Sequence, residues 1–294
     1  MMLRDALGTR PLVADGAMGT QLQLAGLPIG HGSERWNLDH PDAVEAIHRA
    51  YVAAGCDIVL TNSFGAHHWA LAAAGLADRL ADVNRVSAEI ARRAAGPARF
   101  VLGDIGPCGQ MFEPLGTLSP GALRDDVAQR VDALLAAGVD GINCETMTDI
   151  DEAAICVEAA VRAGAPLVIA SMAFDLTPRG AYRTMMGVTP ADAAVRLRDA
   201  GASVVGANCG VRLAVTDFVP LAAHLRDASG LPVMIQPNAG QPVLEDGRAV
   251  YGLGPDAFAR EMLAVVEAGA AIVGGCCGTS PAHLAALCAL IRGR

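Results

Sequence analysis

Hydrophobic residues of this chain form short continuous runs that alternate with longer amphipathic segments. Five of the runs follow an Ala-Gly pair that ends an alanine-rich segment, at Gly55, Gly138, Gly164, Gly201 and Gly269. Glycine just after a helix adopts a positive φ without steric penalty. A run that is apolar throughout is typical of a strand buried on both faces. The pattern therefore predicts a repeating order of helix, glycine turn and parallel strand.

Three further apolar runs complete a set of eight predicted strands. The strands begin near residues 12, 57, 99, 139, 166, 202, 231 and 270. Amphipathic segments between them predict helices, with Pro41 and Pro281 in first turns and Ser280 as an N-cap. Eight βα units favour an α/β fold, a single (β/α)8 TIM barrel spanning residues 1–294 as one domain. A doubly wound sheet is disfavoured, because DGAMGTQLQ after the first strand lacks G-x-G-x-x-G.

The amino-acid composition argues against several classes of protein and of partner. The chain has 22 Lys+Arg, 31 Asp+Glu, a net charge of −9 and 52% hydrophobic residues, which excludes a disordered chain. The acidic balance argues against a nucleic-acid or anionic-membrane partner. The apolar stretch at 163–174 is shorter than the roughly 20 residues of a membrane helix. The N-terminus lacks the apolar core of a signal peptide, so we expect a cytoplasmic protein.

Functional groups of such barrels lie at the C-terminal ends of the strands. The predicted strand ends carry polar or thiol side chains: Asp15, Asn62, Asp104, Cys144, Glu145, Asp175, Cys209, Asn238, Cys276 and Cys277. Adjacent strand residues point to opposite faces, so Glu145 in the barrel mouth places Cys144 in the core. We predict that Cys56, Cys156 and Cys288, in helical or strand-entry segments, also fill the core.

Three cysteines on two strand ends suggest a metal site. Cys209 closes the sixth strand in GANCG, and Cys276 and Cys277 close the eighth in GGCCG. Three thiolates select zinc over magnesium or calcium, and a catalytic zinc keeps a fourth position open. The spacing alone leaves two alternatives: buried free thiols, or a redox disulfide between Cys276 and Cys277.

The sequence motifs that contain these residues also resemble those of a known family. The chain is similar to the zinc-dependent homocysteine S-methyltransferases, in particular the bacterial betaine–homocysteine methyltransferase-like branch and the homocysteine-binding module of cobalamin-dependent methionine synthase. The resemblance covers about 12–290 and rests on these motifs: DGAMGTQL, ERWNLDHPDAVEAIHRAYVAAGCDIVLTNSFGA, ETM, GANCG, QPNAG and GGCCGTSPAHL. It implies a (β/α)8 barrel, Zn2+ held by Cys209, Cys276 and Cys277, and methyl transfer to the thiol of L-homocysteine, giving methionine.

The resemblance also assigns substrate contacts. It places Asp15 and Glu145 near the homocysteine ammonium and Asn238 in the fourth zinc position when substrate is absent. The backbone N–H groups around three residues are candidates to receive the substrate carboxylate: Gly16, Ala17 and Met18. The residues by themselves leave simpler roles open: a helix cap for Asp15, a core ion pair for Glu145 and a turn for Asn238.

The methyl donor is less defined. An onium donor favours aromatic faces, and Trp36 aligns with a tryptophan that contacts betaine in the animal enzymes. Their two further tyrosines are replaced by Gly65 and Thr146. Aromatic substitutes are available in neighbouring loops: Phe64, Phe112 and Tyr182.

Several functions remain open. Betaine is the favoured donor. The alternatives are S-methylmethionine, another sulfonium, or a methyl-corrinoid or methyl-folate partner protein. A function of another class is a non-catalytic zinc- or thiol-binding subunit of a larger complex. The sequence also leaves open a homo-oligomer.

Overall fold

Eight parallel strands form the central barrel in the computed structural model, which describes residues 2–245 and 248–293. In chain order they are β1 (Leu12–Val13), β2 (Ile58–Leu60), β3 (Phe100–Ile105), β4 (Gly141–Met147), β5 (Val168–Met172), β8 (Val204–Cys209), β9 (Val233–Pro237) and β12 (Ile272–Val273). The strands pair in the order β1-β12-β9-β8-β5-β4-β3-β2. A parallel bridge between Ala14 and Ile58 joins β1 to β2, so the sheet closes into a (β/α)8 barrel.

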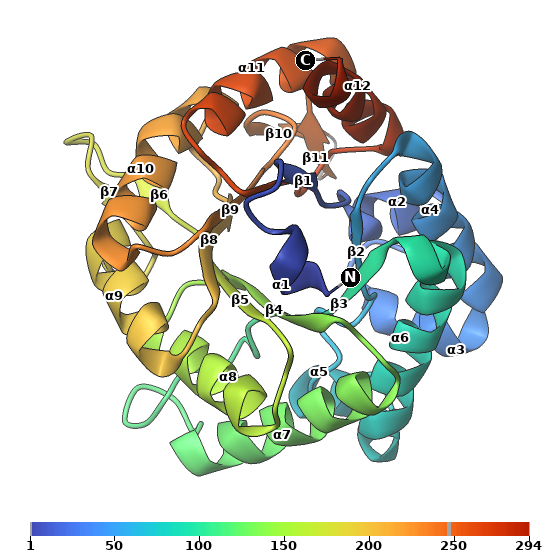
Figure 1. Ribbon diagram of the computed structural model, residues 1–294. Coiled ribbons are helices and arrows are strands. Elements are labelled where there is room, and N and C mark those ends of the chain that lie inside the picture. Colours follow the sequence, from blue (N-terminus) through green and yellow to red (C-terminus); the bar gives the residue numbers. More distant parts are fainter. Residues whose placement is uncertain (1, 246–247, 294) are drawn as a thin grey trace.

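An outer ring of helices surrounds the strands (Figure 1). The main helix after each strand is, in order, α4 (Pro41–Ala54), α6 (Leu80–Ala95), α7 (Pro120–Ala136), α8 (Ile150–Arg162), α9 (Pro190–Ala200), α10 (Phe218–Ser229), α11 (Pro255–Glu267) and α12 (Pro281–Arg292). Shorter helices lie in the connections: α2 (Met18–Leu24), α3 (Trp36–Asp39) and α5 (His68–Ala73). Within the described residues, every helix is too short or too polar to cross a bilayer.

The local predictions from the sequence are confirmed. Each strand begins within two residues of its predicted start. The five glycines of the Ala-Gly pairs all have positive φ, between 78° at Gly164 and 105° at Gly201. Pro41 and Pro281 are the first residues of their helices, and Ser280 is the N-cap of α12.

Two antiparallel hairpins were not predicted. One pairs β6 (Asp175–Leu176) with β7 (Tyr182–Arg183), and the other pairs β10 (Pro242–Glu245) with β11 (Arg248–Tyr251). Their strands have two to four residues, which is too few for a clear periodic signal.

The barrel interior changes from apolar to polar along the strands. Near the N-terminal ends it holds Ile58, Leu102, Ile169 and Met234, on which the short helix α1 (Leu3–Ala6) packs with Leu3 and Ala6. Side chains two residues further along a strand point to the same face. Three of those positions carry buried polar groups: Asp104, Ser171 and Gln236. The fold therefore has a hydrophobic plug at one end and a polar chamber at the other.

Candidate metal and substrate site

A cavity of about 240 Å³ lies at the C-terminal ends of the strands. The described residues that line it include three cysteines, three carboxylic acids and several small or amide side chains, and none of them is an arginine, lysine or histidine. Its acids are Asp15, Asp104 and Glu145, and its cysteines are Cys209, Cys276 and Cys277. The structure thus brings together the thiols and both carboxylates that the sequence indicated.

The three thiols form a compact cluster. Their sulfur atoms all lie within 4.8 Å of one another, and the Sγ atoms of Cys276 and Cys277 are 4.0 Å apart. Tetrahedral zinc with bonds of about 2.3 Å to sulfur would separate its sulfur ligands by about 3.8 Å. The spacing therefore fits a thiophilic tetrahedral metal, and all three cysteines line the cavity.

The backbone at Cys209 is strained. Cys209 and Thr146 have φ of 60° and 59°, and they are the non-glycine residues with positive φ in the described chain. Asn208 connects these two sites: its Oδ1 accepts from the Thr146 N–H at 2.8 Å, and its Nδ2 donates to Thr146 Oγ1 at 2.7 Å. Such strain persists where surrounding contacts impose it, and it concentrates at functional sites.

The thiols interact strongly in the absence of a metal. Hydrogen bonds from Cys209 and Cys276 lower the pKa of Cys277 to about 3. The pKa of Cys276 is well above its ordinary value, because its thiol donates to Cys209 and Cys277 and is buried. Tyr251, in β11, adds a hydrogen bond to the sulfur of Cys277. The hydrogen bonds within the cluster therefore concentrate negative charge on the sulfur of Cys277.

Three carboxyl groups share the cavity with the thiols: Asp15 and Asp104 are buried, and Glu145 is half-buried. Asp15 Oδ2 accepts from the Leu60 N–H at 3.0 Å, whereas its Oδ1 is buried without a partner. Burial raises the pKa of Asp15 well above its ordinary value, and the Glu145 charge raises it further. Burial also raises the pKa of Glu145 to about 7, and Cys277 adds to this effect. The pKa of Asp104 is also raised, first by burial and second by the charge of Glu145. The cavity is thus suited to a positively charged group.

The connection after β1 forms one wall of the cavity. A Cβ on Gly16 would lie 2.4 Å from Thr279 Oγ1, so only glycine allows this close approach. The Ala17 N–H donates to the same Oγ1 at 3.1 Å. The Ala17 N–H therefore already has a partner within the chain, and its role in receiving a carboxylate stays a prediction. Gly16 and Met18 line the cavity, and for them the role stays a prediction.

Asn238 neighbours Cys209 but is not among the residues that line the cavity. Its Nδ2 donates to the Gly210 carbonyl at 2.7 Å, and its buried Oδ1 has no partner. The Asn238 side chain also hydrogen-bonds to Cys209. This position next to a predicted ligand agrees with a role at the metal, which stays a prediction.

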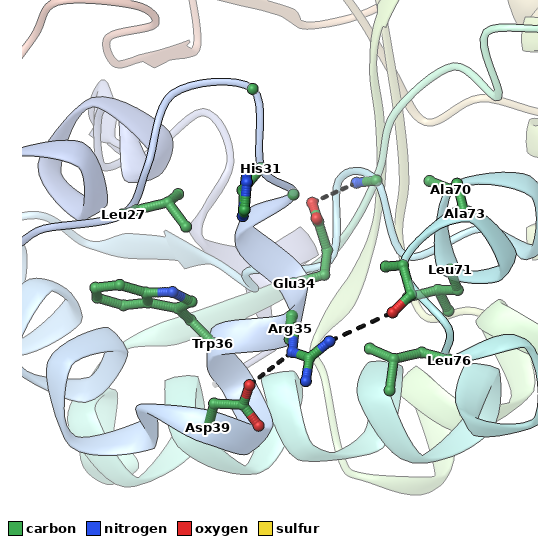
Figure 2. A pocket seen from close by; sticks show the side chains of 14 residues that line it. Leu27, His31, Glu34, Arg35, Trp36, Asp39, Ala70, Leu71, Ala73 and Leu76 are labelled. Carbon is green, nitrogen blue, oxygen red and sulfur yellow. Dashed lines mark hydrogen bonds and ion pairs between the residues drawn. The ribbon is translucent and has the colours of Figure 1, made fainter.

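Trp36 is not brought into the thiol cavity. Its ring lies 4.4 Å from that of His40, centroid to centroid, and packs on the cluster that contains Leu22 and Leu27. It lines a second cavity, between the connection after β1 and helix α5 (Figure 2). Among the aromatic substitutes considered from the sequence, Phe64 lines the thiol cavity, whereas Phe112 and Tyr182 do not.

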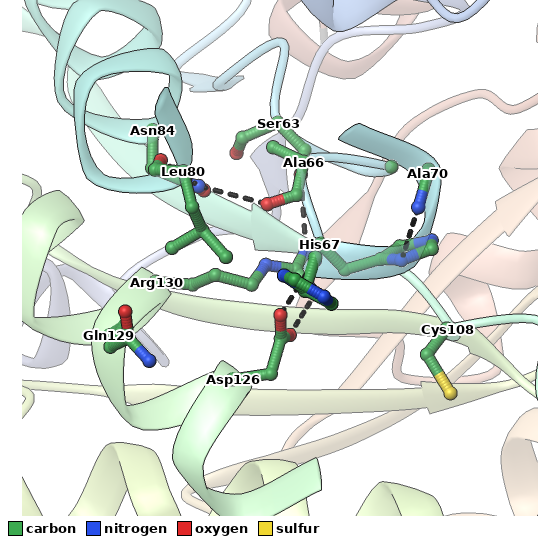
Figure 3. Close-up of polar contacts among 12 residues, drawn as sticks. Ser63, Ala66, His67, Ala70, Leu80, Asn84, Cys108, Asp126, Gln129 and Arg130 are labelled. Atoms are coloured by element: carbon green, nitrogen blue, oxygen red, sulfur yellow. Dashed lines mark hydrogen bonds and ion pairs between the residues drawn. The ribbon is translucent and has the colours of Figure 1, made fainter. Parts of the chain in front are cut away.

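The loop after β2, residues 61–67, is held from outside the barrel (Figure 3). Buried Arg130 of α7 donates to the carbonyl oxygens of Ser63 and Phe64, both at 3.1 Å. Asp126, one turn earlier, accepts from the His68 N–H at 2.7 Å and lies 3.8 Å from the Arg130 guanidinium. These contacts fix the backbone that carries Asn62 and Phe64 into the cavity wall.

Some site residues were missed in the sequence. Asn208 and Gln236 point into the barrel two residues beyond Gly206 and Met234, so strand alternation could have identified them. Tyr251 reaches the thiols from a hairpin that carries no clear signal. The predicted core cysteines are confirmed as buried: Cys56, Cys144, Cys156 and Cys288.

Comparisons with known proteins agree with this geometry. Residues 12–291 match the family model described as homocysteine S-methyltransferase. Methionine synthase of Mycobacterium tuberculosis is 35% identical over 98% of this chain but only 25% of its own length. Bovine betaine–homocysteine S-methyltransferase 1 is 28% identical over 94% of this chain and 71% of its own. The chain thus spans about a quarter of the methionine synthases it matches.

A solved structure shares the whole barrel. The metallated form of the Escherichia coli homocysteine methyltransferase MmuM has a TM-score of 0.78 and 26% identity, over 96% of this chain and 97% of its own. A family model that covers nearly the entire barrel, with the thiol and carboxylate positions gathered on one cavity, identifies the family. The chain belongs to the homocysteine S-methyltransferase family of methyltransferase enzymes.

Proposed function

We propose that this protein is a zinc-dependent methyltransferase that moves a methyl group from an onium donor, with betaine as the leading candidate, to the thiol of L-homocysteine. The product is methionine. One observation carries this proposal: three clustered thiols and three carboxyl groups, two of them buried, line the same cavity, with no basic side chain among the described lining residues. Such a cavity is suited to a thiophilic metal and to a substrate that carries both a thiol and an ammonium group.

Cys209, Cys276 and Cys277 would hold the metal, because their spacing suits tetrahedral thiolate coordination. Zinc held there would favour the thiolate form of the substrate thiol at neutral pH. Asn238 has an unpaired Oδ1 and a side-chain hydrogen bond to Cys209, and it would serve as a further metal ligand when substrate is absent.

The chain's other residues orient the substrate. Asp15 and Glu145 would bind the homocysteine ammonium, which compensates two carboxylates that otherwise lack a cationic partner in the cavity. N–H groups of Gly16 and Met18 would receive the substrate carboxylate. Phe64 and Leu60 cover the cavity wall with apolar surface and limit the access of water to the sulfur.

The transfer itself is a displacement at carbon. The homocysteine thiol first loses its proton to solvent. Its sulfur lone pair then forms the S–CH3 bond while the bond from the methyl carbon to the donor nitrogen or sulfur breaks. The bonding pair leaves with the donor as a neutral amine or thioether, so no general acid is needed. Positioning of the two reactants is the main contribution of the protein.

The proposed chemistry is also compatible with other methyl donors. S-methylmethionine or another sulfonium would react by the same displacement, and a methyl-corrinoid or methyl-folate protein would deliver the methyl group as a partner. Because methionine synthases are among the matched relatives, methyl delivery by a methyl-corrinoid or methyl-folate protein is a specific alternative. We further propose that the protein acts in the cytoplasm without nucleic-acid or membrane partners; a homo-oligomer is compatible with this proposal.

A donor panel tests the proposed function. Zinc-loaded protein and L-homocysteine are incubated separately with betaine, S-methylmethionine, dimethylsulfoniopropionate and methylcobalamin, and methionine is measured. Turnover with betaine supports the proposal, and turnover with one other onium compound corrects the donor. If a zinc-loaded protein binds homocysteine but uses no free donor, the proposal of an enzyme that needs no donor protein is wrong. A partner protein or the non-catalytic role then replaces it.

A further inference from the structure

We propose that Tyr251 is a positioning residue of the predicted metal site: its hydroxyl donates a hydrogen bond to the sulfur of Cys277 and so controls how strongly that sulfur binds a metal. This inference rests on the proposed function, because it takes Cys277 as a metal ligand. It gives a role to the hairpin of β10 and β11, which the sequence did not predict.

Each of the three thiols has a hydrogen bond with one neutral side chain outside the cluster. The pairs are Asn208 with Cys276, Asn238 with Cys209, and Tyr251 with Cys277. None of the described residues that line the cavity is an arginine, lysine or histidine. Neutral donors therefore supply the compensation for thiolate charge that basic side chains of the cavity do not provide.

Tyr251 reaches Cys277 from outside the thiol cavity. Cys277 lines that cavity, whereas Tyr251 does not. The tyrosine ring packs on the turn that follows the two adjacent cysteines: a Cβ on Gly278 would lie 2.2 Å from Tyr251 Cγ, so glycine is what leaves space for the ring. Tyr251 is therefore a neighbour of the predicted ligand and not of the substrate.

The segment that carries Tyr251 is bonded to the Cys277 turn. Two residues after Tyr251, the Leu253 N–H donates to the Ala239 carbonyl at 3.0 Å, and the Leu253 carbonyl accepts from His283 Nε2 at 2.8 Å. The Ala239 N–H in turn donates to the Cys277 carbonyl at 3.0 Å. These bonds hold β11, the segment after β9 and the cysteine turn together, and so fix the hydroxyl relative to the sulfur.

A phenol hydroxyl is suited to this role. It offers one donor hydrogen and stays neutral at physiological pH. A hydrogen bond to a thiolate stabilises the anion and reduces the electron density that the sulfur gives to a metal. Tyr251 would therefore favour the thiolate form of Cys277 and limit the charge that this ligand transfers to zinc.

Tyr251→Phe tests the hydrogen bond, because phenylalanine keeps the ring against Gly278 and removes only the hydroxyl. We expect zinc binding to weaken by about tenfold in competition with a chelator. In the cobalt(II)-substituted protein, the sulfur-to-cobalt charge-transfer band should move to lower energy, because a thiolate without its hydrogen bond gives up electrons more readily. Neither measurement requires turnover.

Two further variants separate the hydrogen bond from packing. Tyr251→Leu removes both the hydroxyl and the ring. If packing alone matters, Tyr251→Phe will match wild type and only Tyr251→Leu will lose zinc affinity, which overturns the proposal. Tyr182→Phe is the matched control: the Tyr182 hydroxyl donates to the Asp217 carbonyl at 2.8 Å, and Tyr182 lines neither cavity. This control should change neither the zinc affinity nor the band.

A folded Tyr251→Phe protein whose charge-transfer band stays at the wild-type position would overturn the role of Tyr251. A wild-type protein that binds no cobalt would overturn the metal site and this inference with it. A failure of the proposed transfer reaction gives a different result: the band would shift in Tyr251→Phe, and yet the wild-type protein would form no methionine from any donor.

Discussion

Asp15 and Asp57 are buried carboxylic acids at opposite ends of the same barrel, and their surroundings differ in kind. Asp57, just before β2, receives two hydrogen bonds from Arg10 at 2.8 and 2.7 Å and one from the Val13 N–H at 3.0 Å. Asp15, just after β1, receives one backbone hydrogen bond and keeps an unpaired buried oxygen.

The pKa values of the two acids shift in opposite directions. Burial raises the pKa of Asp57, but the hydrogen bonds from Arg10 and Val13 and the charges of Arg10 and Arg292 outweigh it, so the net shift is downward. At Asp15, burial and Glu145 dominate and the pKa rises. The N-terminal end of the barrel is therefore arranged for stability, and the C-terminal end keeps unsatisfied groups that a ligand can satisfy.

The largest expected effect is at the thiols of the C-terminal end. Cys277→Ala removes one of three predicted metal ligands, so we expect loss of stoichiometric zinc and a decrease in methyl transfer of about a thousandfold or more. Zinc content and methionine formation measure both, and far-UV circular dichroism checks the barrel. A folded Cys277→Ala protein with full zinc and full activity would contradict the three-thiolate site.

The next effect concerns the loop that Arg130 holds. Arg130→Met leaves the carbonyls of Ser63 and Phe64 without their donor and Asp126 without its counter-charge, which should destabilise the protein by about 3 kcal/mol. Urea unfolding measures the loss. Adding Asp126→Asn removes the uncompensated charge and should recover part of it.

If Arg130 positions the cavity wall, its variant has a kinetic signature as well. The folded Arg130→Met protein should show a higher KM for substrate with its zinc content unchanged, because Asn62 and Phe64 lose their support. A variant that loses stability but keeps wild-type kinetic constants would limit Arg130 to a structural role.

Asp15→Asn tests the comparison at the polar end. It should weaken homocysteine binding by about tenfold or more, because it removes a charge predicted to face the substrate ammonium. In protein without substrate or metal, the same change should maintain or raise stability at neutral pH. A carboxyl group whose folded pKa is raised destabilises the fold as pH rises above about 4.

Asp57→Asn should show the smallest effect and the opposite sign. The folded pKa of Asp57 is lowered, so its contribution is complete at neutral pH and is lost as pH falls below about 4. We expect a loss of about 1–2 kcal/mol at pH 7, because Arg10 is half-exposed and its pairing is partly screened by solvent. The difference from wild type should shrink in acid. If Asp15→Asn and Asp57→Asn gave parallel pH profiles, the contrast between the two ends would be wrong.

Much of the barrel and its thiol site follows from the sequence alone. Apolar runs, Ala-Gly pairs and first-turn prolines are local signals, and they place the starts of the eight strands to within two residues. Once the strands are placed, their ends locate Asp15, Glu145 and the cysteines at one mouth. These predictions succeed because strand alternation and helix termination depend on near neighbours in the chain.

Only the tertiary structure decided what surrounds those groups. The resemblance predicted that Trp36 contacts the donor. In the structure, Trp36 packs against the cluster of Leu22 and Leu27 and lines the second cavity, outside the thiol cavity. Glu34 and Gly65 meet across 31 positions of sequence, and Arg130 reaches the loop after β2 across more than 60. Which side chains share a cavity, and which charges lack a partner, depends on contacts between distant segments, and no local pattern in the sequence encodes them.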